Sequence, residues 1–493
     1  MGFQLSLIVQ GQGLVLFANL HKCEAYVAVQ DCFFAPNDTA EKSLARLFRA
    51  SIGSQMNRFS YHMYEMAHAA LVPARAMTDA AKLVLQNPMN PWAKTSLGRN
   101  MAASAELFER LTRRYGKPGF DFETTSVAGE RVAVTEEIVW ERPFCRVIHF
   151  ARATTRLTQP QPRLLIVAPL SGHYATLLRG TVEAFLPHYE VYITDWADAR
   201  MVPLAAGSFD LDDYIDYLIS IYQVLGKDIE GAGLHTLGVC QPSVPLIAAI
   251  ARMETENHPL VPASMTLMGG PIDTRRSPTA VNKLAQERGI DWFRSNCLYS
   301  VPFPYPGMGR QVYPGFLQLS GFMAMNMDRH MNAHVEMFKH LVEGDGDSAE
   351  KHRDFYDEYM AVMDLSAEYY MQTIENVFVT HSLPKGEMKH RGLPIDLTAI
   401  RRTGLMTVEG EKDDISGVGQ TYAAQELCIN IPDSRKVHYM QPGVGHYGVF
   451  NGSRFRSEIA PRIRDFIATL EYEATGATTR TKPAQLKLAA SKA

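Results

Sequence analysis

The spacing of hydrophobic and polar positions changes several times along the chain, and each change marks a region. Apolar residues recur at helical spacing in 67–85 and 101–115, which predicts a helical N-terminal extension over 1–118. From 120 to 152, apolar and polar residues alternate, as expected for strands at the antiparallel edge of a mixed sheet. From about 163 to 285, short apolar runs alternate with helical stretches, which is the pattern of parallel βαβ units.

The second half of the chain first interrupts this pattern and then resumes it. Residues 286–395 combine aromatic residues and Pro/Gly turns with charged helical stretches such as 348–370, which predicts a cap or lid inserted between the sixth and seventh strands. The strand pattern returns over 396–470, and residues 471–493 have the composition of a mobile tail. We therefore expect an α/β core in which 119–285 and 396–470 form one mostly parallel sheet with helices on both faces.

Composition narrows the class of protein. The chain has 493 residues and a formal net charge of −4, so it can bury a large core and carries no basic patterning of the kind that binds nucleic acid. The first 20 residues lack a basic start and are interrupted by Gln and Gly, so they predict neither a signal peptide nor a transmembrane segment. The cysteines show no disulfide or metal spacing, which favours a reducing compartment such as the cytoplasm; they are Cys23, Cys32, Cys145, Cys240, Cys297 and Cys428.

One cysteine lies in a pattern with chemical meaning. Cys240 is the centre of the pentad Gly-Val-Cys-Gln-Pro at 238–242, which follows an apolar run and precedes a helix-like stretch that starts at Ser243. This order of strand, sharp turn and helix is typical of the nucleophile elbow of α/β-hydrolases, with sulfur in place of the usual serine oxygen. Gly238 and Pro242 fit the crowded turn, since Pro fits the first turn of a helix. A buried structural cysteine is the alternative interpretation.

A carboxylate and a histidine follow in the order of a hydrolase triad. Asp413 comes after the buried strand at 405–409, and His446 lies in a glycine-rich loop after the next strand. Both positions are at the carboxyl ends of strands, where open α/β sheets gather reactive groups. Asp414, the next residue, and Asp273, which follows the sixth strand, are rival acids.

Several unusual strings give the chain a resemblance to a known family. They resemble the intracellular poly(3-hydroxybutyrate) depolymerases of storage-granule bacteria, and the likeness extends over roughly residues 100–470. The strings lie at 167–173, 194–203, 239–242, 268–273, 313–318, 409–417 and 445–448. The resemblance implies that Cys240 is the nucleophile, His446 the general base and Asp413 the acid that orients it.

The chemistry expected of such a site is acyl transfer. The dipole of the following helix and a nearby imidazole both favour a thiolate at Cys240. The backbone N–H of Gln241, with a second N–H from Leu170 or Ser171, would stabilise the oxyanion of the tetrahedral intermediate. The acyl-enzyme intermediate is a thioester, and its acyl group can pass to water or to coenzyme A. Hydrolysis therefore requires no cofactor.

Three functions remain open from the sequence. A depolymerase of intracellular polyhydroxybutyrate is preferred; a polyester synthase also pairs Cys with Asp and His on this fold; and a non-catalytic granule-coating protein is the third. The expected partner is the granule surface in the cytoplasm, with no nucleic acid and an undetermined homo-oligomeric state. Candidate polymer-contacting residues in the cap are Trp292, Phe293, Tyr305 and Phe316, and in the N-terminal helices Met63, Met66 and Met77. Simple core packing is the alternative for both sets.

Overall fold

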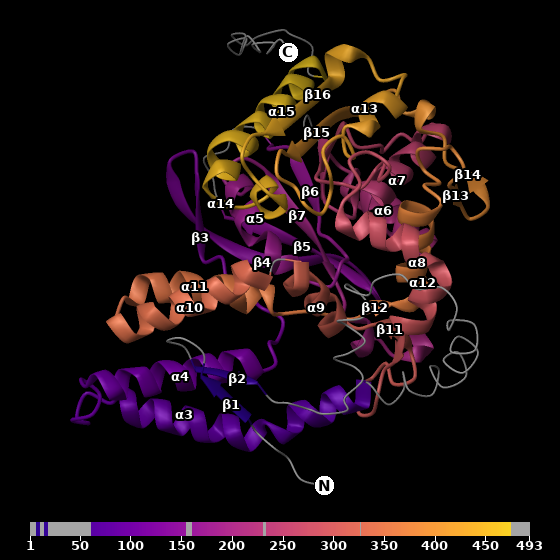
Figure 1. Cartoon of the computed structure of the whole chain (residues 1–493). Helices are drawn as coiled ribbons and strands as arrows, with labels where there is room; N and C mark the ends of the chain where they lie inside the picture. Colours follow the sequence, from indigo (N-terminus) through magenta and orange to yellow (C-terminus); the bar gives the residue numbers. More distant parts are fainter. Residues whose placement is uncertain are drawn as a thin grey trace, which may run out of the picture.

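A computed structural model describes residues 6–9, 14–17, 61–153, 160–229, 233–325 and 327–474. The first four residues of the predicted tail, 471–474, instead belong to a helix, and the rest of that tail and most of the first 60 residues lie outside this range. Figure 1 shows the chain as a sheet-centred body with a helical hairpin formed by its N-terminal part beside it. No helix of the described part has the length and apolar character needed to cross a bilayer.

The body is built on a nine-stranded mixed sheet, counted over the described residues. Neighbouring strands from β16 to β7 run parallel, and β5, β4 and β3 add an antiparallel edge. From one edge to the other the strands are β16 (Lys436–Gln441), β15 (Gly404–Gly410), β9 (Ser264–Met268), β8 (Leu234–Val239), β6 (Arg163–Val167), β7 (Glu190–Trp196), β5 (Cys145–Arg152), β4 (Glu130–Arg142) and β3 (Thr124–Val127).

Helices cover both faces of this sheet. Helices α6 (Leu211–Leu225) and α7 (Ser243–Thr255) pack together on one side, and α5 (Arg179–Phe185) and α15 (Ala460–Ala474) cover the other (Figure 1). The central strands β8 and β9 are buried along their whole length, because parallel strands between two helical layers have no solvent face. The chain thus has the α/β-hydrolase fold that its sequence predicted.

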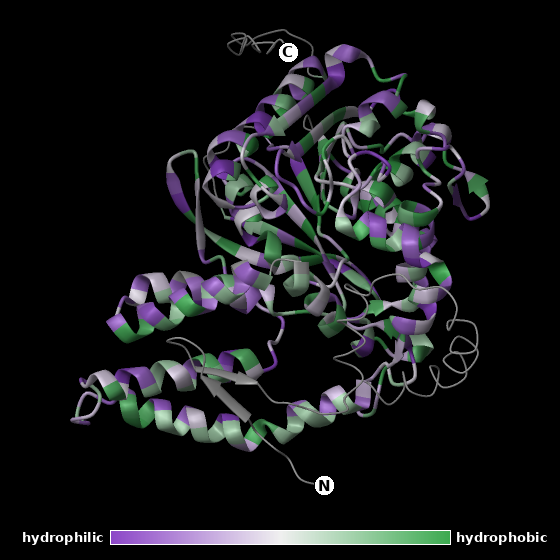
Figure 2. Cartoon of the chain, viewed as in Figure 1, coloured by the Kyte–Doolittle hydropathy of each residue, from purple (hydrophilic) through white to green (hydrophobic). Residues whose placement is uncertain are grey.

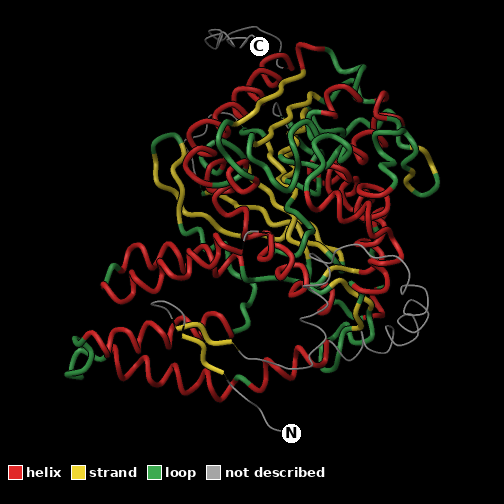
Figure 3. Tube along the Cα trace, in the orientation of Figure 1, coloured by secondary structure: helices red, strands yellow, loops and turns green. Residues whose placement is uncertain are grey.

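A long insertion separates β9 from β15, and Figure 3 shows it as helices with short strands. Its short strands β10, β11 and β12 form one small antiparallel sheet. The elements are α8 (Ala280–Asn296), β10 (Tyr299–Ser300), β11 (Gln311–Tyr313), α9 (Gly315–Met325), α10 (Met327–Glu343), α11 (Gly346–Tyr359), β12 (Leu365–Ser366), α12 (Ala367–Thr373), β13 (Lys389–His390) and β14 (Leu393–Pro394).

The charged stretch at 348–370 differs from its prediction as one helix. Helix α11 ends at Tyr359, the next residues run extended through β12, and α12 begins only at Ala367. The break has a cause in the core, because the N–H of Met363 donates to the carbonyl of Gly172 at 2.7 Å. The carbonyl of Asp364 likewise accepts from the N–H of Ala199 at 3.0 Å. These bonds tie the segment to loops of the main sheet.

Among the described residues, the predicted N-terminal extension is helical only from residue 61 onward, because β1 (Ser6–Val9) and β2 (Leu14–Phe17) pair as antiparallel strands where helix was expected. Residues 61–70 form helical turns that lead into α3 (Val72–Gln86), and α4 (Ser96–Thr112) returns antiparallel to it. Helix α4 packs on α10 of the insertion. Tyr61 is fully buried, and its hydroxyl donates to Asp364 at 2.6 Å, which joins the start of this helical segment to the insertion.

Candidate active site

Cys240 occupies a strained turn between β8 and α7. Its φ is +67°, in the left-handed region that a residue other than Gly enters at a cost of about 1–3 kcal/mol. The turn is held on one side by its N–H, which donates to the carbonyl of Met268 at 2.7 Å. Its carbonyl accepts from the N–H of Ser243 at 3.1 Å. The strain is thus imposed by surrounding backbone, as a nucleophile elbow requires.

Two glycines make room for this turn. A Cβ at Gly238 would lie 2.9 Å from Cδ1 of Leu246, and one at Gly270 would lie 2.0 Å from Oγ of Ser243. Pro242 is the N-cap of α7, with φ of −57°, one position before the first turn in which the sequence placed it. Its missing N–H leaves no donor unsatisfied there. The close contact of strand and helix therefore explains why small or rigid residues surround Cys240.

His446 is held by Asp413 at the end of the neighbouring strands. The Nδ1–H of His446 donates to Oδ2 of Asp413 at 2.7 Å, and both side chains are buried. The other carboxylate oxygen accepts from the N–H groups of Ile415 and Ser416, at 2.9 Å and 2.8 Å. Gly269, with φ of +56°, lies beside the pair, since a Cβ there would lie 3.3 Å from His446 Cε1. The carboxylate is thus fixed in position and orients the imidazole.

The charge on His446 depends on both neighbours. Burial lowers the pKa of His446, but the Asp413 carboxylate and the Cys240 thiol, through charge and hydrogen bonding, raise this pKa well above its ordinary value. A protonated His446 is therefore favoured between the Asp413 carboxylate and the Cys240 sulfur.

The rival acids lie elsewhere. Asp273 is buried, but both of its oxygens accept from the guanidinium of Arg275, at 2.7 Å and 2.8 Å. Arg275 holds the pKa of Asp273 below its usual range, against the raising effect of burial. Asp414 is exposed. Among the three candidates, Asp413 is therefore the carboxylate in contact with His446.

Cys240 and His446 open onto a cavity of about 230 Å³ whose walls are mainly apolar. Leu170, Ser171 and Gln241 line it as well, and the N–H of Leu170 faces Oε1 of Gln241 at 3.4 Å. The insertion supplies Tyr313 and Phe322 from its aromatic run to the cavity wall. Five further aromatic residues of the wall were not singled out from the sequence: Tyr369, Tyr370, Phe378, Tyr447 and Phe450. An apolar cavity with a few converging polar groups is typical of a small-molecule or chain-binding site.

The four aromatic residues predicted to contact substrate lie in different parts of the structure. Phe293 lines the cavity, and Trp292 packs edge-on against its ring. Phe316 instead stacks on Tyr64 of the N-terminal helical segment, with ring centroids 4.0 Å apart. The hydroxyl of Tyr305 donates to Glu65 at 3.1 Å. Only Phe293 of the four belongs to the cavity wall, while Phe316 and Tyr305 connect the insertion to the N-terminal helices.

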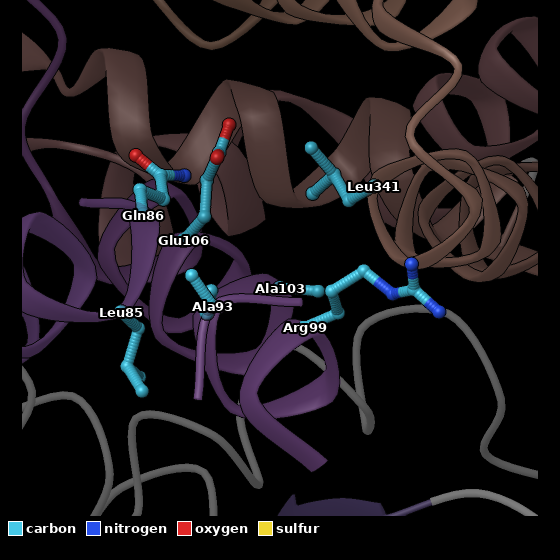
Figure 4. A pocket seen from close by; sticks show the side chains of 8 residues that line it. Leu85, Gln86, Ala93, Arg99, Ala103, Glu106 and Leu341 are labelled. Carbon is cyan, nitrogen blue, oxygen red and sulfur yellow. The ribbon is translucent and has the colours of Figure 1, made fainter. Parts of the chain in front are cut away.

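Two other features could be taken for a catalytic site: a buried Ser-His-Glu set and a second hollow. His235 lies 2.7 Å from Ser264 Oγ and 2.9 Å from Glu471, a Ser-His-Glu set. Both Ser264 and His235 are fully buried near the amino ends of β9 and β8, opposite Cys240, so the set ties α15 to the sheet and meets no substrate. A hollow of about 170 Å³ near α3, α4 and α10 has no nucleophile in its walls, and its Glu106 pairs with Arg353 (Figure 4). Neither feature supports chemistry.

Among the described residues, no cluster of three His, Cys, Asp or Glu side chains has the geometry of a metal site. The polar groups that converge on the cavity are instead those of acyl transfer: a thiol, an imidazole with a fixed carboxylate, and the backbone around Gln241 and Leu170.

Parts of the sequence are similar to a known family and to a curated protein. Residues 269–471 match the family described as PHB de-polymerase C-terminus. The poly(3-hydroxyalkanoate) polymerase subunit PhaC of Haloferax mediterranei is 20% identical over 376 residues, which is 72% of this chain and 70% of that protein. The chain therefore has an α/β-hydrolase fold, and parts of its sequence are similar to this family and to this polymerase subunit.

Solved structures similar to this chain include hydrolases at low identity. A bacterial membrane phospholipase A has a TM-score of 0.38 at 12% identity, over 68% of this chain and 86% of that one. A putative lipase from Acinetobacter baumannii AYE has a TM-score of 0.37 at 13% identity, over 69% and 93%. The hypothetical protein PA2218 from Pseudomonas aeruginosa has a TM-score of 0.40 at 10% identity, over 72% and 99%.

Proposed function

We propose that the protein is a depolymerase that cleaves ester bonds of poly(3-hydroxybutyrate), with Cys240 as nucleophile, His446 as general base and Asp413 as its orienting acid. One observation carries the proposal: the strained Cys240 faces an apolar cavity beside His446, which Asp413 holds at 2.7 Å. The match to the depolymerase family over 269–471 supplies the substrate class.

The geometry supports a two-step acyl transfer. The Cys240 thiolate attacks the ester carbonyl carbon, and the C=O π electrons move onto the carbonyl oxygen to give a tetrahedral oxyanion. When the oxyanion collapses, the C–O bond to the polymer alcohol breaks and the imidazolium of His446 donates its proton to the departing oxygen. The acyl group remains on Cys240 as a thioester, and His446 is left neutral.

The oxyanion would be held by backbone donors of two loops. The N–H of Gln241 lies at the start of α7, where the helix dipole also favours negative charge. Leu170 and Ser171 line the same cavity and offer the second N–H. In the free enzyme the Leu170 N–H faces the Gln241 side chain at 3.4 Å, a long bond that an incoming oxyanion can replace.

Release of the acyl group needs an acceptor. Neutral His446 takes a proton from water, the resulting hydroxide attacks the thioester, and Cys240 leaves as the thiolate, which regenerates the ion pair. Hydrolysis of this kind requires no cofactor and releases 3-hydroxybutyrate or short oligomers. Coenzyme A can replace water as the acceptor, in which case 3-hydroxybutyryl-CoA forms.

Synthesis is the second candidate, because the curated relative is named a polymerase subunit. The same cysteine would then accept acyl groups from a thioester and pass them to a growing polymer alcohol. A non-catalytic coat protein is the least favoured function, since it has no need for a strained cysteine beside a fixed His–Asp pair. In the preferred function the enzyme acts in the cytoplasm on the surface of storage granules.

The test is product release from amorphous poly(3-hydroxybutyrate) particles by the purified protein, with and without coenzyme A. Cys240→Ala should abolish release, and Cys240→Ser should retain at most a small fraction, because the serine hydroxyl must lose its proton during attack. Cys428→Ala, at a buried cysteine outside the cavity, is the matched control and should remain active. An active Cys240→Ala variant would remove the proposal, and polymer growth from 3-hydroxybutyryl-CoA without release would assign synthesis.

A further inference from the structure

The helical segment 61–86 exposes an apolar stripe along its whole length. Seven positions at heptad spacing are all apolar and all exposed, and we call them the outward stripe: Met63, Met66, Ala70, Pro73, Met77, Ala80 and Val84. The exposed fractions of the large side chains are 42% for Met63, 63% for Met66, 74% for Met77 and 61% for Val84. Figure 2 shows this segment in white and green with hydrophilic positions between them.

None of the four charged residues of the segment lies on the stripe: Asp79 and Lys82 pair with each other at 3.9 Å, and Glu65 and Arg75 bond within the molecule. Glu65 bonds to Arg114 at 2.7 Å and to the Tyr305 hydroxyl, and Arg75 donates to the carbonyls of Thr112 and His68. A surface helix of a globular protein normally turns its apolar stripe to the core and its charges to solvent. Here the arrangement is reversed, so the outward stripe is built to contact something outside the described chain.

The flanks of the stripe indicate what kind of surface it contacts. The neighbouring positions are Ala67, Ala74 and Ala81 on one side and His62, Ala69, Ala76 and Leu83 on the other. In a coiled coil these flanking positions usually carry charges that select a partner helix and its direction. Apolar residues at all of these positions except His62 widen the stripe into an apolar face about 39 Å long, since each of 26 residues adds about 1.5 Å. Such a face fits an extended apolar surface better than one specific helix.

We propose that the outward stripe docks the enzyme on the uncharged surface of an amorphous polyester particle, an inference that rests on the proposed function. The cavity at Cys240 has about 230 Å³, which admits part of a single chain and not a particle. The enzyme must therefore remain at the polymer surface while single chains enter the cavity. A face without charges loses no ion hydration when it contacts methyl and ester groups, and it removes exposed apolar area from water.

The test is sedimentation of the full chain with amorphous poly(3-hydroxybutyrate) particles, in a Cys240→Ala background so that the polymer is not consumed. The stripe variant carries Met66→Glu, Met77→Glu and Val84→Glu. All three sites are exposed and Glu is a good helix former, so the fold should be retained. Binding should weaken by roughly tenfold or more, because three charges must be desolvated at the contact.

A control variant matches the stripe variant in number and exposure. Ile138→Glu, Leu393→Glu and Ile429→Glu change side chains that are 53%, 52% and 65% exposed and lie outside 61–86, and binding should not change. Lys at the three stripe sites should weaken binding as much as Glu does. The proposal would be overturned if the stripe variant bound particles as well as its parent does, or if the control variant lost as much binding as the stripe variant. It would also be overturned if Glu at the stripe sites weakened binding and Lys did not.

Other occupants of the stripe give different results. If the stripe pairs two copies of this chain, light scattering will show that the stripe variant halves the molecular mass while particle binding persists, which overturns docking. If it binds membranes, phosphatidylcholine vesicles will capture the protein and polymer particles will not, with the same consequence.

Catalysis is measured separately, with Cys240 intact, on a small water-soluble ester. There the stripe variant should match the wild type within about twofold, since a single small ester needs no surface docking. If the wild type cleaves neither the ester nor the polymer, the proposed function fails while the binding result still stands. If the wild type cleaves both the ester and the polymer but the stripe variant binds particles normally, the docking proposal fails while the proposed function stands.

Discussion

Replacing Asp413 by Asn is the sharpest test of the proposed site, because it changes a charge and leaves the shape intact. Oδ1 of the new amide can still accept from the N–H groups of Ile415 and Ser416, as the carboxylate does at 2.9 Å and 2.8 Å. The amide NH₂ then faces His446 Nδ1, where the carboxylate accepted at 2.7 Å. Nδ1 must become the acceptor, so the ring proton moves to Nε2 and the imidazolium loses its partner.

The size of the effect follows from the lost interaction. A hydrogen bond to a charged group contributes about 1.5–3 kcal/mol, and about 1.36 kcal/mol is a tenfold change in rate, so turnover should fall between about tenfold and about 150-fold. This is less than the penalty in a serine triad, because the thiolate needs less help from the imidazole. Asp413 also raises the pKa of His446. Without it that pKa falls, the imidazolium is lost at lower pH, and the alkaline limb of the pH–rate profile moves down.

The assay is the pH–rate profile on a small ester, together with the melting temperature of each variant. Asp414→Asn is the matched control for an exposed neighbour, and Asp273→Asn for a buried carboxylate that pairs with Arg275. Both should keep turnover within about threefold of the wild type, as neither contacts His446. A larger loss for Asp273→Asn than for Asp413→Asn, or an unmoved alkaline limb in Asp413→Asn, would refute the assignment.

Two further predictions concern the cavity wall and the junction with the N-terminal helices. Phe293→Ala should weaken small-ester binding, measured as KM, more than Trp292→Ala, because Phe293 lines the cavity and Trp292 is not part of its wall; equal KM values would contradict this. Burial raises the pKa of Asp364 to about 7 from 3.8, with Asp198 adding to the rise. The Asp364 carboxyl ionises at lower pH in the unfolded chain than in the folded one, so the unfolding free energy should fall as pH rises from about 4 to about 7. In Asp364→Asn, urea titrations should show a smaller fall of the unfolding free energy over the same pH range.

The sequence predicted the parts of the site that depend on local spacing. The elbow around Cys240 could be recognised because strand, turn and helix are consecutive, and its crowding restricts Gly238 to a small residue. Asp413 and His446 could be found because each follows a strand of the parallel sheet. The choice of Asp413 over Asp273 needed the structure, because only the structure shows that Arg275 bonds to both oxygens of Asp273.

The cavity wall could not be predicted in the same way. Aromatic residues of the insertion have the same pattern whether they face Cys240 or another helix, and Phe316 in fact stacks on Tyr64. Tyr369 and Tyr370 belong to α12, which the sequence joined to the helix before it. The break between those helices comes from bonds to distant loops such as Gly172, which no local pattern records.

Those bonds give the insertion a role beyond covering the cavity. The Tyr369 hydroxyl donates to the carbonyl of Leu170 at 3.2 Å, and Met363 donates to the carbonyl of Gly172 at 2.7 Å. His173 donates through Nε2 to the carbonyl of Tyr359 at 3.0 Å. The loop that offers the Leu170 and Ser171 N–H groups is therefore fixed from outside by the insertion, while β8 and α7 fix the Gln241 N–H from inside. Because an oxyanion is stabilised only by donors already in place, the insertion would contribute to the proposed mechanism by positioning one of them.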